Sequence, residues 1–118
     1  MGLLEADGLA ALINAAARNH EVIANNLANL NTPGYLTARL RFTDQLDAIL
    51  DEVGNLRSGK TIDTETYFPF LGEPGPDGNN VVLEREIVEL EKNALQMKLY
   101  LAVLGSRIGR LRAAIDGR

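Results

Sequence analysis

The chain has 118 residues, and its 12 Lys and Arg against 16 Asp and Glu give a net charge of −4 and an isoelectric point near 4.9. This acidic balance argues against nucleic acid as the main partner, because phosphate binding needs a basic face. The absence of cysteine excludes a disulfide scaffold, a Cys-ligated zinc site and a thiol nucleophile. A single histidine, His20, excludes any site that needs two imidazoles.

The N-terminal residues 1–7 carry two acids and no basic residue. A secretory signal begins instead with a positive region followed by an apolar run. The longest apolar run, residues 99–104, is far shorter than the about 20 residues that a membrane-spanning helix needs. We therefore expect no cleaved signal peptide and no direct membrane insertion.

The first predicted element is an amphipathic helix in the N-terminal part. Apolar or small residues recur every three or four positions, which places them on one helix face. The only polar member of this stripe is a histidine, which we expect to set the register of the contact. The stripe consists of Leu9, Ile13, Ala16, His20, Ile23, Leu27 and Leu30.

The central region is predicted to be less regular. Residues 42–53 fit one short amphipathic helix, which Gly54 would end. Residues 61–70 can form a short extended segment that Pro69 interrupts. The Gly- and Pro-rich residues 72–78 are predicted to be a turn or loop.

The C-terminal part predicts a long second helix with a coiled-coil seam, because every step between its apolar residues is three or four. At 1.5 Å per residue this helix would be about 50 Å long. Gly105 and Gly109 each lower helix propensity by up to ~1 kcal/mol, so we expect another helix to approach closely there. The seam consists of Leu83, Ile87, Leu90, Ala94, Met97, Leu101, Leu104, Ile108, Leu111 and Ile115.

The distribution of charged residues supports the same helix, and its N-cap is unusual. Four glutamates, at positions 84, 86, 89 and 91, lie in its first turns, and three arginines, at 107, 110 and 112, lie near its end. Both groups suit the helix dipole, which we favour over contact with an acidic partner as the role of the arginines. Val82 cannot act as an N-cap, so we expect Asn80 to substitute.

These elements predict a mostly α fold in which long N- and C-terminal helices pair as an antiparallel coiled coil. Residues 1–36, 37–80 and 81–118 would be the first helix with its turn, the short helix with a variable loop, and the second helix, in one domain formed from both termini. A two-helix hairpin leaves apolar flanks uncovered, so we expect an assembly subunit that is poorly ordered alone. The alternative is an ordinary monomeric helical domain.

One segment of the sequence matches the consensus of a nucleotide-binding motif. Residues 54–61 read G-x-x-x-x-G-K-T, which predicts a small nucleotide-binding regulator that uses Gly59, Lys60 and Thr61. That loop works only between a buried strand and a helix, where backbone N–H groups converge on phosphate. Here the preceding residues have a helical pattern instead of a strand pattern, and the following residues lack a helical pattern. Nucleotide binding therefore remains an alternative only. A second alternative is a cytoplasmic coiled-coil adaptor.

Other candidates for catalysis are weak. The pairs Asp44/Asp47, Asp51/Glu52 and Glu86/Glu89 are predicted to lie on solvated helix faces with no cleft. Neither serine lies in the G-x-S-x-G turn that exposes a nucleophile. We therefore expect no enzyme, with no catalytic residue, no cofactor and no metal.

The most informative segment is residues 23–35, which hold four asparagines in seven positions although asparagine is a mediocre helix former. Amides both donate and accept hydrogen bonds, which suits a helix that is surrounded by other protein rather than by water. The end of the segment, Thr32-Pro33-Gly34-Tyr35, fits a type II turn with Pro at its second and Gly at its third position. The helix is thus predicted to stop sharply at an anchor, Tyr35.

This segment closely resembles the motif shared by bacterial flagellar rod and hook proteins. The C-terminal runs 77–81, 83–86, 93–100 and 103–106 are similar to the same region of proximal-rod proteins, and together the two regions cover roughly two-thirds of the chain. The resemblance identifies the packing positions of the motif as Asn25, Asn26, Leu27, Asn29, Asn31, Thr32, Pro33, Gly34 and Tyr35.

The resemblance implies an axial structural subunit of the flagellar basal-body rod. Such subunits pack helically and form a hollow shaft that transmits torque. The implied partners are further copies of the chain, other flagellar rod proteins, the junction between membrane ring and rod, and the flagellar type III export apparatus. The implied location is the periplasmic rod of the basal body, reached by export without a cleaved signal.

Overall fold

The computed structural model describes the backbone of residues 2–41 and 64–117, with side chains from residue 9 onward. The elements in chain order are helix α1 (Gly2–Ala28), strand β1 (Arg39–Arg41), strand β2 (Glu65–Tyr67) and helix α3 (Leu83–Ile115). The molecule is elongated, with extents of 65 × 23 × 16 Å. Two long helices and one small strand pair thus make a mostly helical fold.

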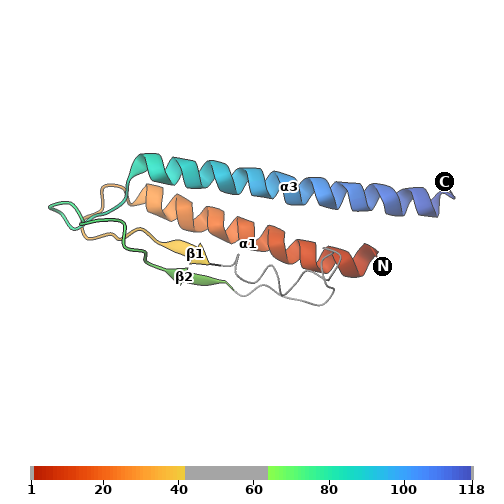
Figure 1. Ribbon diagram of the computed structural model, residues 1–118, viewed down its shortest axis with the longest axis horizontal. Helices are drawn as coiled ribbons and strands as arrows, with labels where there is room; N and C mark the ends of the chain where they lie inside the picture. Colours follow the sequence, from red (N-terminus) through yellow and green to blue (C-terminus); the bar gives the residue numbers. More distant parts are fainter. Residues whose placement is uncertain (1, 42–63, 118) are drawn as a thin grey trace.

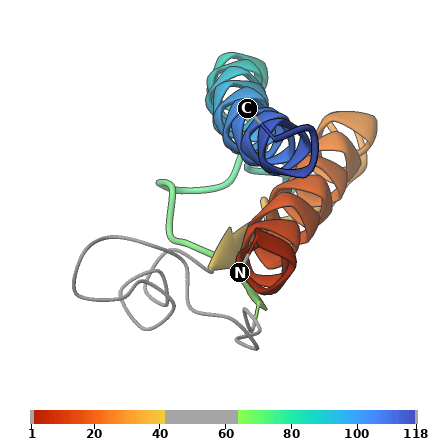
Figure 2. The same cartoon turned by 90° about the vertical axis from the view of Figure 1, so that its right-hand side faces the viewer.

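The two helices lie side by side and run in opposite directions, with the chain reversal at one end of the molecule (Figure 1). The strand pair lies beside α1, which therefore contacts both α3 and β1. Viewed along the long axis, α3 and the strand pair lie next to different sides of α1 (Figure 2). Both long helices predicted from the sequence are confirmed, although α1 ends at Ala28 and not at Leu30.

The start of α3 confirms the missing cap. Val82 occupies the N-cap position in an extended conformation (φ −115°, ψ 116°) and makes no side-chain cap hydrogen bond. The prediction that Asn80 substitutes as the cap is wrong. Its side-chain oxygen instead accepts a hydrogen bond from the backbone N–H of Thr37 at 2.6 Å, so it ties α3 to the segment that leads into β1.

A cluster of buried apolar side chains lies in the half of the hairpin away from the chain reversal, while Ile23 is buried near the reversal. Leu9 and Leu12 of α1 are buried in this cluster, and the half-buried Ile13, Tyr100 and Leu104 pack against them. Burial also raises the pKa of the Tyr100 hydroxyl, because the charged form loses hydration. This small core fits the limited apolar area that a two-helix unit can bury.

The extended segment predicted within residues 61–70 is confirmed as β2, which pairs antiparallel with β1 from Arg39 opposite Tyr67 to Arg41 opposite Glu65. The Arg41 guanidinium lies 4.2 Å from the centre of the Tyr67 ring. Residues 71–80 form the predicted loop. The predicted short helix over 42–53 and the motif at 54–61 lie outside the described residues.

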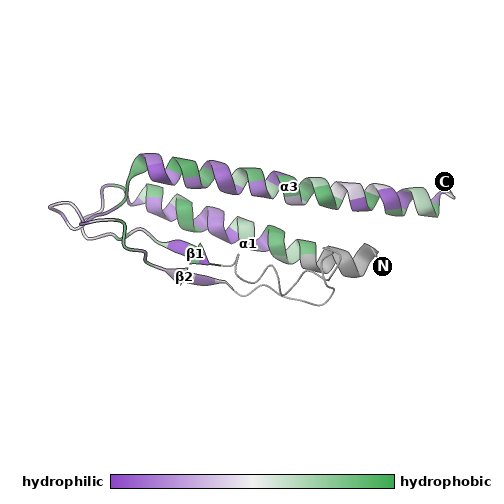
Figure 3. Ribbon diagram, viewed as in Figure 1, coloured by the Kyte–Doolittle hydropathy of each residue, from purple (hydrophilic) through white to green (hydrophobic). Residues whose placement is uncertain are grey.

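Many large apolar side chains of α3 remain exposed, and apolar residues recur along the whole helix (Figure 3). Leu99 and Val103 are 58% and 41% exposed, as expected if a two-helix hairpin leaves apolar flanks uncovered. Phe70, which follows β2, is 81% exposed. Within the described part of the chain, no helix combines the length and the apolar character needed to cross a membrane.

Candidate assembly site

The asparagine-rich end of α1 meets β1 and the start of α3 at a buried amide. Asn26 is fully buried, and its Nδ2 donates to the Ala38 carbonyl at 2.9 Å and to Glu86 Oε1 at 2.6 Å. Its Oδ1 accepts from the Ala38 N–H at 3.0 Å and from the Tyr35 hydroxyl at 3.2 Å. One amide therefore uses its full capacity to join three segments of the chain.

A buried ion pair lies beside this amide. Glu86 of α3 has no exposed surface, and its two oxygens accept from the two terminal nitrogens of Arg39 at 2.7 Å each. This bidentate geometry is the strong form of an arginine–carboxylate contact. The hydrogen bonds and charge of Glu86 raise the pKa of Arg39 against the opposing effect of burial.

The solvated position predicted for Glu86 is therefore wrong. Its place near the helix N-terminus suits the dipole, but the side chain turns inward to the arginine of β1. The sequence carried no signal for this contact, because Arg39 lies in a three-residue strand that the apolar pattern did not reveal.

The turn after α1 has the geometry that its sequence predicted. The Tyr35 N–H donates to the Thr32 carbonyl at 3.2 Å, and Gly34 has a φ of +76°. A positive φ at the third position is what a type II turn requires. The type II turn predicted at Thr32–Tyr35 is thus confirmed in its backbone.

The loop before α3 docks on this turn. The Nδ2 of Asn79 donates to the carbonyls of Asn29 at 2.9 Å and Thr32 at 2.8 Å. The Gly34 N–H donates to the Asp77 carbonyl at 2.8 Å. Gly78 has a φ of +81°, and a Cβ atom there would lie 3.3 Å from the Gly34 Cα. Gly78 thus lets the backbones of turn and loop approach closely, while Gly34 supplies the positive φ of the turn.

A second polar contact joins the helices halfway along. Asn93 of α3 is buried, and its Nδ2 donates to the Ala16 carbonyl at 2.8 Å. Its Oδ1 accepts from the Nδ2 of Asn19 at 2.9 Å. This is the register-setting contact that the sequence predicted for His20, whose side chain is exposed instead. The prediction for His20 is wrong because the helices face each other one residue earlier on α1.

The motif positions differ in their burial. Asn26 is buried, while Leu27, Asn29 and Tyr35 are half-buried. The Asn29 amide donates to the Asn25 carbonyl at 2.8 Å and accepts from the Thr32 hydroxyl at 3.0 Å, so it stabilises the helix end locally. The remaining motif residues, which are available to neighbouring molecules, are Asn25, Asn31, Thr32, Pro33 and Gly34.

The predicted seam residues fall into two groups. Those that are buried or half-buried are Leu9, Ile13, Ile23, Leu27, Leu90, Met97 and Leu104. Those that are exposed on α3 are Leu83, Ile87, Ala94, Leu101, Ile108, Leu111 and Ile115. The face of α3 that meets α1 is therefore rotated about the helix axis relative to the predicted seam. Glu86, Asn93 and Tyr100, which lie outside the predicted seam, belong to this face.

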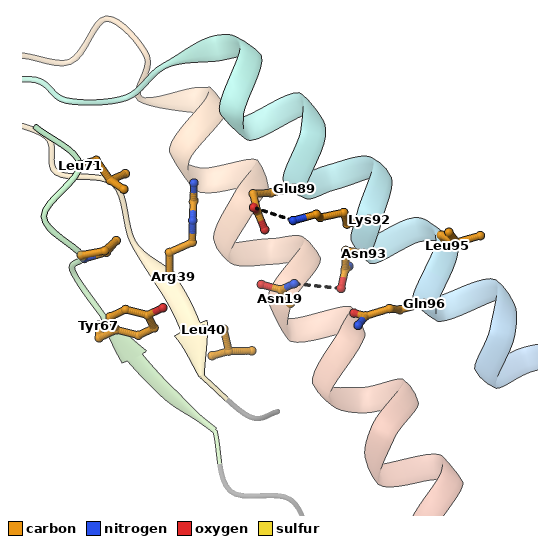
Figure 4. A pocket seen from close by; sticks show the side chains of 11 residues that line it. Asn19, Arg39, Leu40, Tyr67, Leu71, Glu89, Lys92, Asn93, Leu95 and Gln96 are labelled. Atoms are coloured by element: carbon orange, nitrogen blue, oxygen red, sulfur yellow. Dashed lines mark hydrogen bonds and ion pairs between the residues drawn. The ribbon is translucent and has the colours of Figure 1, made fainter. Parts of the chain in front are cut away.

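An open cleft of about 590 Å³ lies between the strand pair and α3 (Figure 4). Leu40, Tyr67 and Leu71 line one side, and Leu95 lies on the α3 side. Lys92 contacts Glu89 at 3.8 Å within it. The cleft has an apolar wall and paired charges, which suits a contact with protein.

We call the cluster formed by Asn26, Tyr35, Arg39, Asn79 and Glu86 the polar corner. The role of these contacts is structural. The carboxylate of the polar corner is bound to an arginine, and its amides are bound to backbone groups, to this carboxylate and to the Tyr35 hydroxyl. Throughout residues 9–41 and 64–117, no three His, Cys, Asp or Glu side chains gather as a metal site requires. Such an arrangement fixes the relative position of two helices.

Comparison with known proteins agrees with this architecture. Residues 11–35, which span most of α1 and the turn, match the family model described as "Flagella basal body rod protein". The flagellar basal body rod protein FlgB of Aquifex aeolicus is 32% identical over 109 residues, which cover 90% of this chain and 88% of that protein. FlgB of Bacillus subtilis is 27% identical (90% and 91% covered), and FlgB of Salmonella typhimurium is 26% identical (89% and 88% covered).

A long helical hairpin with a polar corner and a rod-protein motif defines a structural subunit of the flagellar basal-body rod. The chain belongs to the FlgB family of these proteins. It is a structural protein and not an enzyme. The comparisons do not support the nucleotide-binding alternative.

Proposed function

We propose that the chain is a proximal-rod subunit whose α1–α3 hairpin packs against neighbouring copies and other rod proteins. The observation that carries this proposal is the exposed apolar surface of α3, which includes Leu95 at 62% and Leu99 at 58% exposure. A lone hairpin cannot cover such a surface, whereas a ring of neighbours can. The FlgB relatives support a place in the rod of the basal body.

The hairpin works in this proposal as an antiparallel coiled coil that is locked at one end. Leu27, Leu90, Met97 and Leu104 supply apolar contacts between the helices, and the corner around Asn26 fixes their register. Torque on the shaft would then be resisted by interlocked side chains and by buried hydrogen bonds, which break only together. The one-domain arrangement formed from both termini follows from the same pairing.

The partners proposed here follow the family. They are further copies of the chain, other flagellar rod proteins, the junction with the membrane ring and the flagellar export apparatus, which would deliver the subunit without a cleaved signal. The exposed motif residues at the corner, Asn31 to Gly34, are the surface available to partners at that end of the molecule.

A complementation experiment tests the function. In cells that lack the chain, Leu27→Asp or Leu104→Asp should abolish rod assembly and swimming while the subunit is still exported. The reason is that each carboxylate enters an apolar contact between helices, where burial of an unpaired charge is costly. Rods are counted by electron microscopy of purified basal bodies, in which the wild-type chain should be located in the shaft.

Thr66→Asp is the matched control, since it adds the same carboxylate at an exposed position of β2. It should leave swimming intact. Normal swimming of both leucine variants would show that the helix contact does not support assembly. Detection of the wild-type chain only in the cytosol would refute the rod proposal itself.

A further inference from the structure

The turn that follows α1 has little of its own to hold it in shape. Its exposed residues are Asn31, Thr32, Pro33 and Gly34. Within the turn, the Tyr35 N–H donates to the Thr32 carbonyl at a distance of 3.2 Å. A segment that buries so little surface gains too little free energy to offset the entropy of ordering its backbone. Its fixed shape therefore needs support from another part of the chain.

That support comes from four consecutive residues ahead of α3, which we call the latch. The latch consists of Asp77, Gly78, Asn79 and Asn80. The Gly34 N–H donates to the Asp77 carbonyl at 2.8 Å. The Asn79 amide donates to the carbonyls of Thr32 at 2.8 Å and Asn29 at 2.9 Å. These bonds are shorter than the 3.2 Å bond inside the turn, so the latch is the main support of the turn.

The Asn79 side chain is held ready to donate by bonds within its own loop. Its Oδ1 accepts from the Val81 N–H at 2.7 Å. Its backbone N–H donates to Asp77 Oδ1 at 3.1 Å, and its carbonyl accepts from the Gly75 N–H at 3.0 Å. Every polar group of Asn79 thus has a partner. The loop therefore fixes the direction in which the amide nitrogen of Asn79 meets the turn.

The latch also fits the turn sterically. Gly78 has a φ of +81°, and a Cβ atom there would lie 3.3 Å from the Gly34 Cα. Gly72, in the same loop, has a φ of +97°, but a Cβ atom there would meet none of the described residues within 4 Å. A side chain at position 78 would therefore push latch and turn apart, whereas one at position 72 would strain its own backbone only.

The latch reaches the turn through the pairing of the two long helices. Both segments lie at the end of the molecule where α1 ends and α3 begins (Figure 1). Near the start of α3, Glu86 accepts from the Asn26 amide of α1 at 2.6 Å. Within the latch, Asn80 Oδ1 accepts from the Thr37 N–H at 2.6 Å. The same pairing that brings α3 to α1 therefore brings the latch to the turn.

We propose that the latch holds the turn in the shape that it presents to partners, with Asn79 as the positioning residue. The exposed surface from Asn31 to Gly34 is then complete only after the two ends of the chain have paired. This inference rests on the proposed rod function and adds a condition to it. A chain whose ends have not paired lacks this surface and is not incorporated.

Two variants test the latch in the purified full-length chain. Asn79→Asp keeps the size of the side chain but donates no hydrogen bond to the two carbonyls of the turn. Gly78→Ala separates latch and turn by a methyl group. Hydrogen exchange followed by NMR reads the amides of Gly34 and Tyr35 individually. In both variants these amides should exchange roughly tenfold faster than in the wild type, because the turn opens locally.

Residues 86–97 provide the internal reference. Their amides should stay within roughly threefold of the wild type in every variant, because Glu86 and Asn93 hold α3 against α1 without the latch. Gly72→Ala is the matched control, since it imposes a positive φ on alanine in the same loop without crowding the turn. It should leave the Gly34 amide unchanged. Circular dichroism checks that every variant keeps its helices.

Complementation in cells shows whether the shape of the turn matters for assembly. Asn79→Asp and Gly78→Ala should each reduce swimming and the number of rods, whereas Gly72→Ala should not. Four results would overturn the inference: unchanged exchange in the turn, equal loosening of residues 86–97, an equal effect of Gly72→Ala, or normal swimming of both latch variants. The proposed function is judged separately, because basal bodies that contain the wild-type chain support it however the latch variants behave.

Discussion

At the scale of single residues, the corner is held by side chains that a helix normally exposes. Asn26, Asn93 and Glu86 are buried, and each hydrogen-bonds to a segment distant in sequence. Buried polar groups contribute little net free energy when satisfied, but an unsatisfied partner is costly. Such groups therefore select one register of the hairpin, which apolar contacts alone leave free to slide.

We expect Glu86→Gln to lower the free energy of unfolding by about 3 kcal/mol, since it leaves Arg39 without its bidentate carboxylate partner in a largely buried position. The Arg39 side chain is only 15% exposed, so water cannot replace the lost carboxylate well. Urea denaturation followed by circular dichroism measures the change.

The control is Glu89→Gln, which removes a carboxylate one turn later on the same helix. Glu89 lies 3.8 Å from Lys92, whose side chain is 70% exposed, and such pairs contribute well under ~1 kcal/mol. Equal losses in the two variants would show that the Arg39–Glu86 pair has no special role in stability.

At the scale of elements, the sequence predicted what depends on periodicity. The helices α1 and α3 follow from spacings of three and four, and the turn at Thr32–Tyr35 follows from Pro33 and Gly34. The facing surfaces were harder to predict, because α3 is apolar on several faces and only the partner decides which one is buried. The strand β1 has just three residues, two of them arginine, which leaves no apolar alternation to detect.

The candidate site was predictable to the same extent. The asparagine-rich run marked the right end of α1, since four amides in seven positions have no use on a solvated helix. The partners of these amides were not visible, because Ala38 offers only its backbone and Glu86 suits a helix N-terminus equally well. The polar corner was therefore located by sequence, while its contacts required the structure.

The uneven contacts of α3 predict uneven hydrogen exchange in the isolated subunit. Amides of residues 105–115 should exchange roughly tenfold faster than those of residues 86–97. The reason is that residues 86–97 are held against α1 through Glu86, Leu90 and Asn93. Mass spectrometry after deuterium labelling measures the two segments in one experiment. In purified basal bodies the difference should disappear, and equal protection in the free subunit would contradict the picture of an unsupported tail.

At the scale of the whole molecule, the hairpin has a cluster of polar contacts at one end and a cluster of apolar contacts at the other. The chain reversal is closed by hydrogen bonds and an ion pair, whereas the far half relies on a small core around Leu9 and Leu12. The free subunit should therefore keep its corner and lose order along the far half first. Assembly then adds the apolar contacts that the chain does not provide for itself.

Gly105 and Gly109 test where these added contacts lie. A Cβ atom at either position would meet no atom of the described residues within 4 Å, so the described part of α1 does not explain the glycines that the sequence placed in α3. In the free subunit, Gly105→Ala with Gly109→Ala should therefore raise helix stability by about 0.5–1 kcal/mol per site, measured by thermal unfolding. In cells the same pair should reduce rod assembly and swimming, because a neighbouring helix that approaches the bare backbone would meet two methyl groups. The control is Ser106→Ala, which changes an exposed residue between the glycines and adds no bulk. If the double glycine variant swims like the wild type, the neighbouring helix lies elsewhere.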